Sequence, residues 1–190
     1  MELSDDLISH FHRRGFFLVP NLLGTEKVGK VDLLQRKITH EWENTNWPEG
    51  FNRLACQFFM VGELLLEIVE QPHLLEIARR LLGCTEVHIG ACGIGDASLI
   101  ISEDGRSERQ VHWHSDGDAT VKQVSFRTAL DRHDPTNAPL RVLPGSHNRP
   151  KGVVLEELRQ LELATGKHNV TPKLLFETHP EELVLVLDPA

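Results

Sequence analysis

The spacing of apolar residues changes near position 84, and this change constrains the fold more than any other feature. Before it, apolar side chains recur every three or four residues, which is the period of an amphipathic helix. After it, short apolar stretches alternate with turn residues, which is typical of strands joined by short connections. Helices first and many short strands afterwards predict an α+β fold, with helices packed on a predominantly antiparallel sheet or barrel.

The first half of the chain predicts four helices. Ser4 can cap a short first helix, because its side-chain oxygen can accept a hydrogen bond from a free backbone N–H. Gly15 can end that helix, because glycine readily adopts the left-handed conformation found there. The apolar residues 16–19 predict a buried strand. The other three helices are predicted at residues 25–43, 58–70 and 73–82.

The second half of the chain predicts short strands with one helix among them. The helix is predicted at residues 153–164, and an Asp-Gly pair at 104–105 indicates a hairpin turn. No internal repeat, low-complexity tract or linker divides the chain, so residues 1–190 are expected to form a single domain. The strands are predicted at residues 87–94, 97–102, 111–114, 121–130, 140–143 and 183–187.

The composition excludes several classes of function. The formal net charge of −8 argues against binding nucleic acid or an anionic membrane surface, because both require a cationic face. The apolar runs are too short to cross a bilayer, and the acidic start of the chain does not resemble a signal peptide. Three cysteines without a paired spacing suit reduced thiols, so we expect a cytoplasmic protein.

Metal chemistry is indicated by residues 111–117, which read VHWHSDG. In a strand, residues two apart point to the same side, so the side chains of His114 and Asp116 can converge. An imidazole and a carboxylate arranged in this way supply two ligands of the two-His, one-carboxylate triad of non-heme Fe(II) oxygenases. A histidine from a distant strand would complete the triad, leaving positions open for a 2-oxo acid and dioxygen.

The same residues permit a second interpretation. His112, His114 and Asp116 resemble the start of the His-x-His-x-Asp-His sequence of metallo-β-lactamase-like hydrolases, which bind zinc. Their zinc chemistry needs a histidine directly after the aspartate, and Gly117 stands at that position here. A zinc hydrolase that uses these three residues is therefore the weaker alternative.

Four further stretches resemble one family. Residues 137–147, which read NAPLRVLPGSH, are similar to a stretch that follows the metal-binding His-x-Asp strand of the phytanoyl-CoA dioxygenase family. Residues 11–23, which read FHRRGFFLVPNLL, resemble the opening of that family. The Leu-Leu-Gly at 81–83 is similar to the segment before the family's first core strand. Residues 182–189, which read ELVLVLDP, resemble the strand that leads to its distal histidine.

The resemblance implies a double-stranded β-helix, a cupin-like jelly roll, with the N-terminal helices packed on one sheet. It implies that His114 and Asp116 bind Fe(2+) and are the catalytic residues, with 2-oxoglutarate as co-substrate. Dioxygen would then hydroxylate a small organic substrate, while 2-oxoglutarate is converted to succinate and CO2. Halogenation is excluded, because halogenases of this class have a small residue in place of the carboxylate ligand.

The resemblance also leaves the third iron ligand open. The family's distal histidine is expected just after residues 183–187, followed by the arginine that pairs with 2-oxoglutarate, whereas the sequence given stops at Ala190. His179 is the one substitute within the chain, although it precedes the last predicted strand. A site with two protein ligands would bind iron weakly. The alternative function is therefore a degenerate, non-catalytic family member that acts as a binding module.

Other side chains receive secondary predictions. Arg127 is the candidate for binding the 2-oxoglutarate carboxylate, because it lies on a strand that lines the family's pocket and a buried arginine needs an anionic partner. His147 is expected to be a loop residue that fixes the Pro-Gly turn before it, and His112 to pack beside the predicted iron ligands. The glycines of residues 90–95 lack the spacing of a dinucleotide-binding loop and are interpreted as close strand approaches or a bulge.

Overall fold

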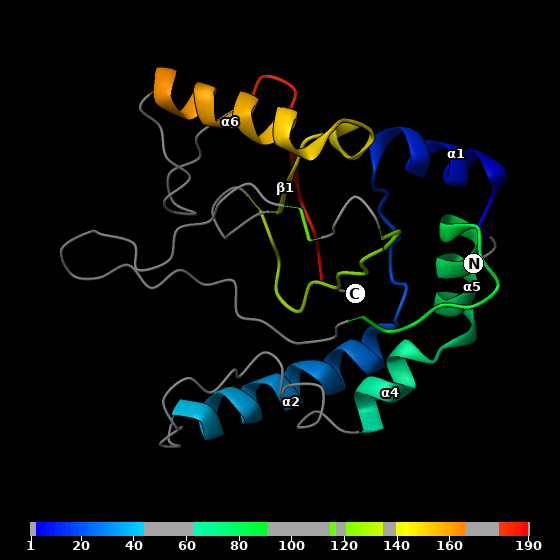
Figure 1. Ribbon diagram of the computed structural model, residues 1–190. Helices are drawn as coiled ribbons and strands as arrows, with labels where there is room; N and C mark the ends of the chain where they lie inside the picture. Colours follow the sequence, from blue (N-terminus) through cyan, green and yellow to red (C-terminus); the bar gives the residue numbers. More distant parts are fainter. Residues whose placement is uncertain are drawn as a thin grey trace. The chain divides into compact units, whose positions relative to one another are not determined.

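The computed structural model describes residues 3–43, 63–90, 115–116, 121–134, 140–165 and 179–189. These residues form five α-helices, one short 3-10 helix and a two-stranded antiparallel sheet (Figure 1). The chain divides into two compact units, one built from residues 19–96 and the other from residues 2–18 and 97–188. No helix in the described ranges is long and apolar enough to span a membrane.

The first helix, α1 (Asp5–Arg14), belongs to the second unit and has the two ends that the sequence predicts. The Ser4 side chain accepts a hydrogen bond from the Leu7 N–H at 3.3 Å. Gly15 follows with φ 86° and donates its N–H to the Phe11 carbonyl at 2.7 Å. Acidic residues in the first turn and basic residues in the last turn complement the helix dipole.

The first unit contains α2 (Thr25–Glu43), α4 (Glu63–Val69) and α5 (Pro72–Leu82). Helices are therefore confirmed at 25–43, 63–69 and 73–82, while residues 58–62 lie outside the described residues. Pro72 opens α5, where its missing N–H costs nothing, and Gly83 closes it with φ 66°. The buried apolar residues of these helices recur at helical spacing: Val28, Val31, Leu65, Ile68, Leu74, Ile77, Ala78 and Leu81.

The sheet of the second unit pairs two stretches that are far apart in the sequence. Strand β1 (Leu140–Val142) runs antiparallel to β2 (Leu183–Leu185), with Arg141 opposite Val184. The pairing continues past β2, where His133 and Leu187 exchange backbone hydrogen bonds of 2.8 and 2.9 Å. Helix α6 (Lys151–Thr165) lies beside this sheet (Figure 1). It packs through Val154 and Leu158 against Leu143, and these three side chains form a buried cluster.

The predicted strands are only partly present in the described residues. The strands at 140–143 and 183–187 are confirmed over three residues each. The strand predicted at 16–19 is wrong, since these residues form an irregular connection whose Phe17 ring packs edge-on against Phe11 of α1 at 5.9 Å. Residues 87–90 and 121–130 are likewise irregular in the described part of the chain. Among the described residues, no atom lies within 4 Å of a Cβ atom placed at Gly90, so this part of the chain makes no close approach there.

Helices combined with antiparallel strands confirm the mixed α and β character that the sequence predicts. The complete jelly roll stays a prediction, because it requires strands at 97–102 and 111–114, which lie outside the described residues.

Candidate metal centre and its supporting contacts

The predicted metal ligands are only partly described by the structure. Asp116 is described, and the residue is exposed. His112 and His114 lie outside the described residues. Among the residues that the structure describes, no group of three His, Cys, Asp or Glu side chains is arranged to hold a metal ion.

The peptide between the two predicted ligands is attached to the start of α6. Lys151, the first residue of α6, donates a hydrogen bond from Nζ to the carbonyl oxygen of Ser115 at 3.1 Å. Ser115 lies directly between His114 and Asp116 in the sequence. The structure therefore connects the predicted metal-binding segment to a helix that starts 35 residues after Asp116.

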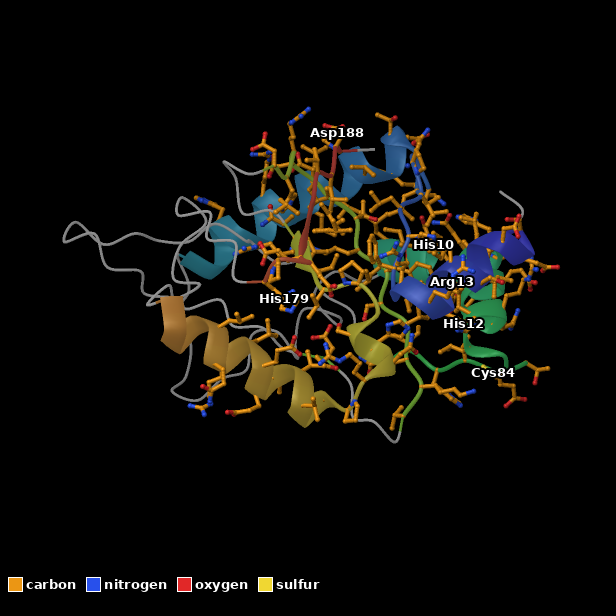
Figure 2. All side chains as sticks on the ribbon, turned by 90° about the horizontal axis from the view of Figure 1, so that it is seen from above. His10, His12, Arg13, Cys84, His179 and Asp188 are labelled. Atoms are coloured by element: carbon orange, nitrogen blue, oxygen red, sulfur yellow. The ribbon has the colours of Figure 1, made fainter. Side chains whose placement is uncertain are left out.

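The PGSHN stretch that precedes α6 docks on the last turn of α1. The Gly145 N–H donates to the Arg14 carbonyl at 2.9 Å. The carbonyl of His12 accepts hydrogen bonds from Nε2 of His147 at 3.1 Å and from Nδ2 of Asn148 at 2.8 Å. These contacts satisfy carbonyl groups that the end of a helix leaves without intrahelical partners. Figure 2 labels His12 on α1, the helix that receives these contacts.

His147 therefore differs in detail from its prediction. It lies in the short 3-10 helix η1 (Ser146–Asn148) after the Pro-Gly turn, and the hydrogen bond of its ring joins the turn to α1. Because the His12 carbonyl can only accept, Nε2 of His147 carries the proton in this contact. The role of His147 is structural, as expected, but its ring joins the Pro-Gly turn to α1 and does not only fix the turn.

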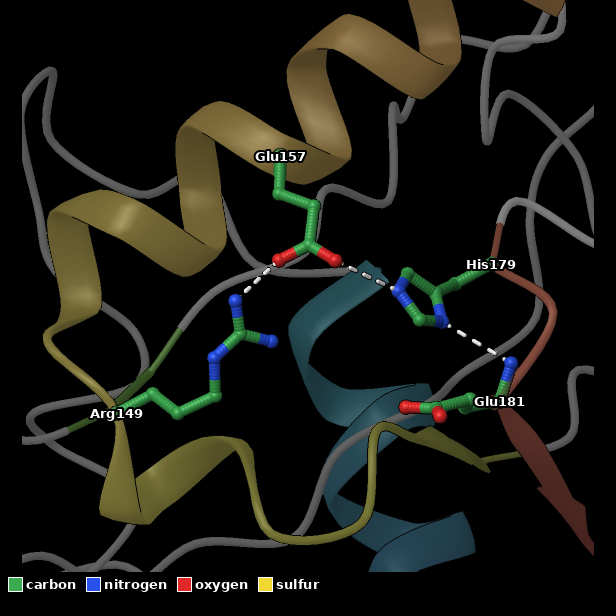
Figure 3. A network of polar contacts seen from close by, with 4 residues as sticks. All are labelled: Arg149, Glu157, His179 and Glu181. Carbon is green, nitrogen blue, oxygen red and sulfur yellow. Dashed lines mark hydrogen bonds and ion pairs between the residues drawn. The ribbon is translucent and has the colours of Figure 1, made fainter.

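His179 is buried, with 6% of its surface exposed, and both of its ring nitrogens are engaged. Its Nδ1 accepts a hydrogen bond from the Glu181 N–H at 3.0 Å, so Nε2 carries the proton and donates to the Glu157 carboxylate at 3.1 Å (Figure 3). A metal ligand must offer a free nitrogen lone pair. His179 is therefore not positioned as the substitute third ligand that the sequence left open.

Glu157 also forms an ion pair with Arg149, and Figure 3 shows its carboxylate between Arg149 and His179. The hydrogen bond from His179, together with that from Arg149, lowers the pKa of the Glu157 carboxyl below its usual value. The network joins Arg149, two positions before α6, to the first half of α6 and to the segment before β2. It therefore holds α6 to the segment that precedes β2.

Arg127 does not have the burial on which its prediction rested. Its side chain is exposed, so the requirement of a buried arginine for an anionic partner does not apply to it. Its role in binding 2-oxoglutarate stays a prediction.

The sequence interpretation missed a buried ion pair beside the sheet. Arg141 of β1 pairs with Glu182, and their side chains are 16% and 3% exposed. The sequence did contain a signal for this pair. The stretches LRVL and ELVLVL are apolar except for one charged residue each, and charged side chains are buried only when they are paired.

Comparison of the sequence with known protein families identifies the family of this chain. The sequence profile of the family described as Phytanoyl-CoA dioxygenase (PhyH) matches residues 11–173. The chain belongs to this family. The resemblance that the sequence stretches predicted is thereby confirmed, and the family implies a cupin-like fold and a dioxygenase. Membership also disfavours the zinc-hydrolase alternative.

Curated relatives of this family member are named ectoine dioxygenase. The chain is 26% identical over 162 residues to that of Bordetella bronchiseptica, 27% over 161 residues to that of Nocardia farcinica and 22% over 195 residues to that of Stutzerimonas stutzeri. The matches cover 77%, 77% and 90% of this chain, but 50%, 52% and 62% of the relatives. The chain thus spans about half the length of the first two relatives. No solved structure matches the protein significantly.

Proposed function

We propose that this protein is an Fe(II)- and 2-oxoglutarate-dependent dioxygenase that hydroxylates a small organic substrate. In the balanced reaction, substrate, dioxygen and 2-oxoglutarate give hydroxylated substrate, succinate and CO2. Family membership supports the reaction class, and relatives named for a small molecule, ectoine, support a small substrate. Because identity to these relatives is 22–27%, ectoine itself is not part of the proposal.

The observation that carries the proposal is the environment of Asp116. The residue is exposed, and the peptide that precedes it is attached to α6 through Lys151. The donor set fits Fe(II), since a carboxylate oxygen and an imidazole nitrogen two residues apart are ligands that non-heme iron accepts. His114 and Asp116 would hold the ion, which would supply the site for dioxygen chemistry when bound. The protein's own groups would orient the co-substrate and substrate beside it.

A non-catalytic binding module is the second candidate. It is favoured by one observation, namely that both ring nitrogens of His179 are already engaged, so that this histidine does not supply the third ligand. The two candidates differ in one measurable property, since only the dioxygenase consumes 2-oxoglutarate.

The test is succinate formation by the full chain supplied with Fe(II), ascorbate, 2-oxoglutarate and dioxygen. We expect slow, substrate-independent turnover by the wild-type protein and none by Asp116→Ala. Asp6→Ala, which removes an exposed carboxylate from the first turn of α1, is the matched control and should keep the wild-type rate. Equal succinate formation by all three proteins would show that Asp116 has no role in the reaction. No succinate formation by the wild-type protein would favour the binding module.

A further inference from the structure

The start of α6 departs from the usual charge preference of a helix. The first turn of α6 contains no acidic residue, and its first position is Lys151, a cation at the positive end of the helix dipole. Helices α1 and α2 follow the usual preference, with Asp5 and Asp6 in the first turn of α1 and Glu26 in that of α2. Helix α5 also lacks an acidic residue in its first turn, but it begins with the uncharged Pro72, whereas α6 begins with a cation. Positions where a local preference is violated are often those that serve a site.

Lys151 makes one contact that bears on the predicted ligands. Its Nζ donates to the Ser115 carbonyl at 3.1 Å, and a hydrogen bond from a charged donor is stronger than one between neutral groups. The Ser115 carbonyl belongs to the peptide that joins Ser115 to Asp116. A bond to its oxygen holds the peptide that precedes the Asp116 Cα atom, and so limits the movement of the backbone from which the Asp116 side chain extends.

The backbone around Lys151 is held in place by packing and by an ion pair. Val154 and Leu158, one and two turns further along α6, are buried against Leu143. The residue two positions before Lys151, Arg149, is paired with Glu157 of the same helix. The hydrogen bond therefore connects a packed helix to the predicted ligand segment, as a support for a metal ligand requires.

We propose that Lys151 is a positioning residue for the iron site, which sets the orientation of Asp116 through the Ser115 carbonyl. This inference rests on the proposed function, because it assumes that Asp116 is a metal ligand. It assigns Lys151 no contact with iron, co-substrate or substrate. Groups that support a metal ligand from outside typically change metal affinity about 10- to 100-fold when they are removed.

The test uses Co(II) as a stable probe for the iron site. We expect Lys151→Met to weaken Co(II) binding by about tenfold, as calorimetry measures it, and to change the visible absorption spectrum of bound Co(II). Lys151→Arg keeps a charged donor and should restore both properties to near wild type. Lys30→Met is the matched control, because the Lys30 ammonium pairs with Glu26 on its own helix, at 2.7 Å, and it should bind Co(II) as wild type does.

The outcomes separate this inference from the proposed function. If wild type binds Co(II), Asp116→Ala loses it and Lys151→Met matches wild type in affinity and spectrum, the positioning role of Lys151 is wrong and the iron site stands. Tighter Co(II) binding by Lys151→Met would also overturn the inference, since charge repulsion would then outweigh positioning. If wild type and Asp116→Ala behave alike, both proposals fail. Unchanged circular dichroism and melting temperature of Lys151→Met would show that any loss does not come from unfolding.

Discussion

The Nδ1 atom of His147 lies 2.6 Å from the position that a Cβ atom would occupy at Gly15. Gly15 ends α1 with φ 86°, and the His147 ring lies over it while its Nε2 bonds to the carbonyl of His12. The opening stretch of the chain and the PGSH stretch, which lie 132 positions apart at Gly15 and His147, thus meet in one contact. Both were recognised as family features, and the structure shows that one is packed against the other.

Replacement of Gly15 by alanine is expected to destabilise the protein by about 2 kcal/mol or more. A residue with a Cβ atom is strained in the left-handed conformation, at a cost of about 1–2 kcal/mol, and here the new atom also collides with the His147 ring. Urea unfolding followed by circular dichroism measures the change.

The control for this substitution is Gly152→Ala in α6. No atom in the described part of the chain lies within 4 Å of a Cβ atom placed at Gly152, and the residue is helical, so this variant should be neutral or up to about 1 kcal/mol more stable. If Gly15→Ala were as stable as Gly152→Ala, the described contact between α1 and the PGSH stretch would be incorrect.

The buried ion pair beside the sheet predicts a non-additive pair of substitutions. Glu182→Leu leaves the guanidinium of Arg141 buried without this carboxylate and should cost about 3 kcal/mol. The double variant Arg141→Met/Glu182→Leu removes both charges and should be clearly more stable than the single variant. Denaturant midpoints of the three proteins provide the measurement.

An exposed pair in the same unit serves as the comparison. Arg132 pairs with Asp188 at 2.8 Å, with side chains that are 60% and 67% exposed, so Arg132→Met should cost less than about 1 kcal/mol. An equal loss of stability from Glu182→Leu and from Arg132→Met would contradict the burial of the Arg141–Glu182 pair.

Acid is expected to weaken the second unit through two glutamates of α6. Hydrogen bonds from Arg159 and Gln160 lower the pKa of Glu156 from 4.5 to about 2, and the pKa of Glu157 is lowered as well. For both glutamates the pKa in the folded state lies below the pKa in the unfolded state. Between these two values the unfolded state binds more protons, so the free energy of unfolding rises with pH. The contribution is complete above the unfolded pKa and is lost as pH falls from about 5 toward 2.

The measurement is the urea midpoint across this pH range. Glu156→Gln should make the dependence shallower, and added salt should do the same because the group is exposed and screened. An identical pH dependence in wild type and Glu156→Gln would rule out a role for the Glu156 contacts.

The parts of the fold that follow from local chemistry were predictable. The ends of α1 follow from Ser4 and Gly15, and those of α5 from Pro72 and Gly83, because capping depends on residues within one turn. The strand at 16–19 was wrong because a short apolar run packs equally well against a neighbouring helix, which the Phe11–Phe17 contact shows.

The contacts around the candidate site were not predictable in the same way. The bonds from Lys151 to Ser115, and from His179 to Glu157, join residues 36 and 22 positions apart, and no local pattern specifies such pairs. The sequence could name Asp116 as a candidate ligand from its spacing to His114, but not the helix whose first residue bonds to the peptide before it. Family resemblance supplied the order of the segments, and the structure supplied their contacts.

The central claim is that Asp116 and His114 hold Fe(II), and anaerobic calorimetric titration of Fe(II) into the full chain tests it most directly. The account predicts one ion per chain for the wild-type protein, and a loss of affinity greater than about tenfold in Asp116→Ala and in His114→Ala, with circular dichroism unchanged. Wild-type affinity in both variants, or no Fe(II) binding by the folded wild-type protein, would contradict it.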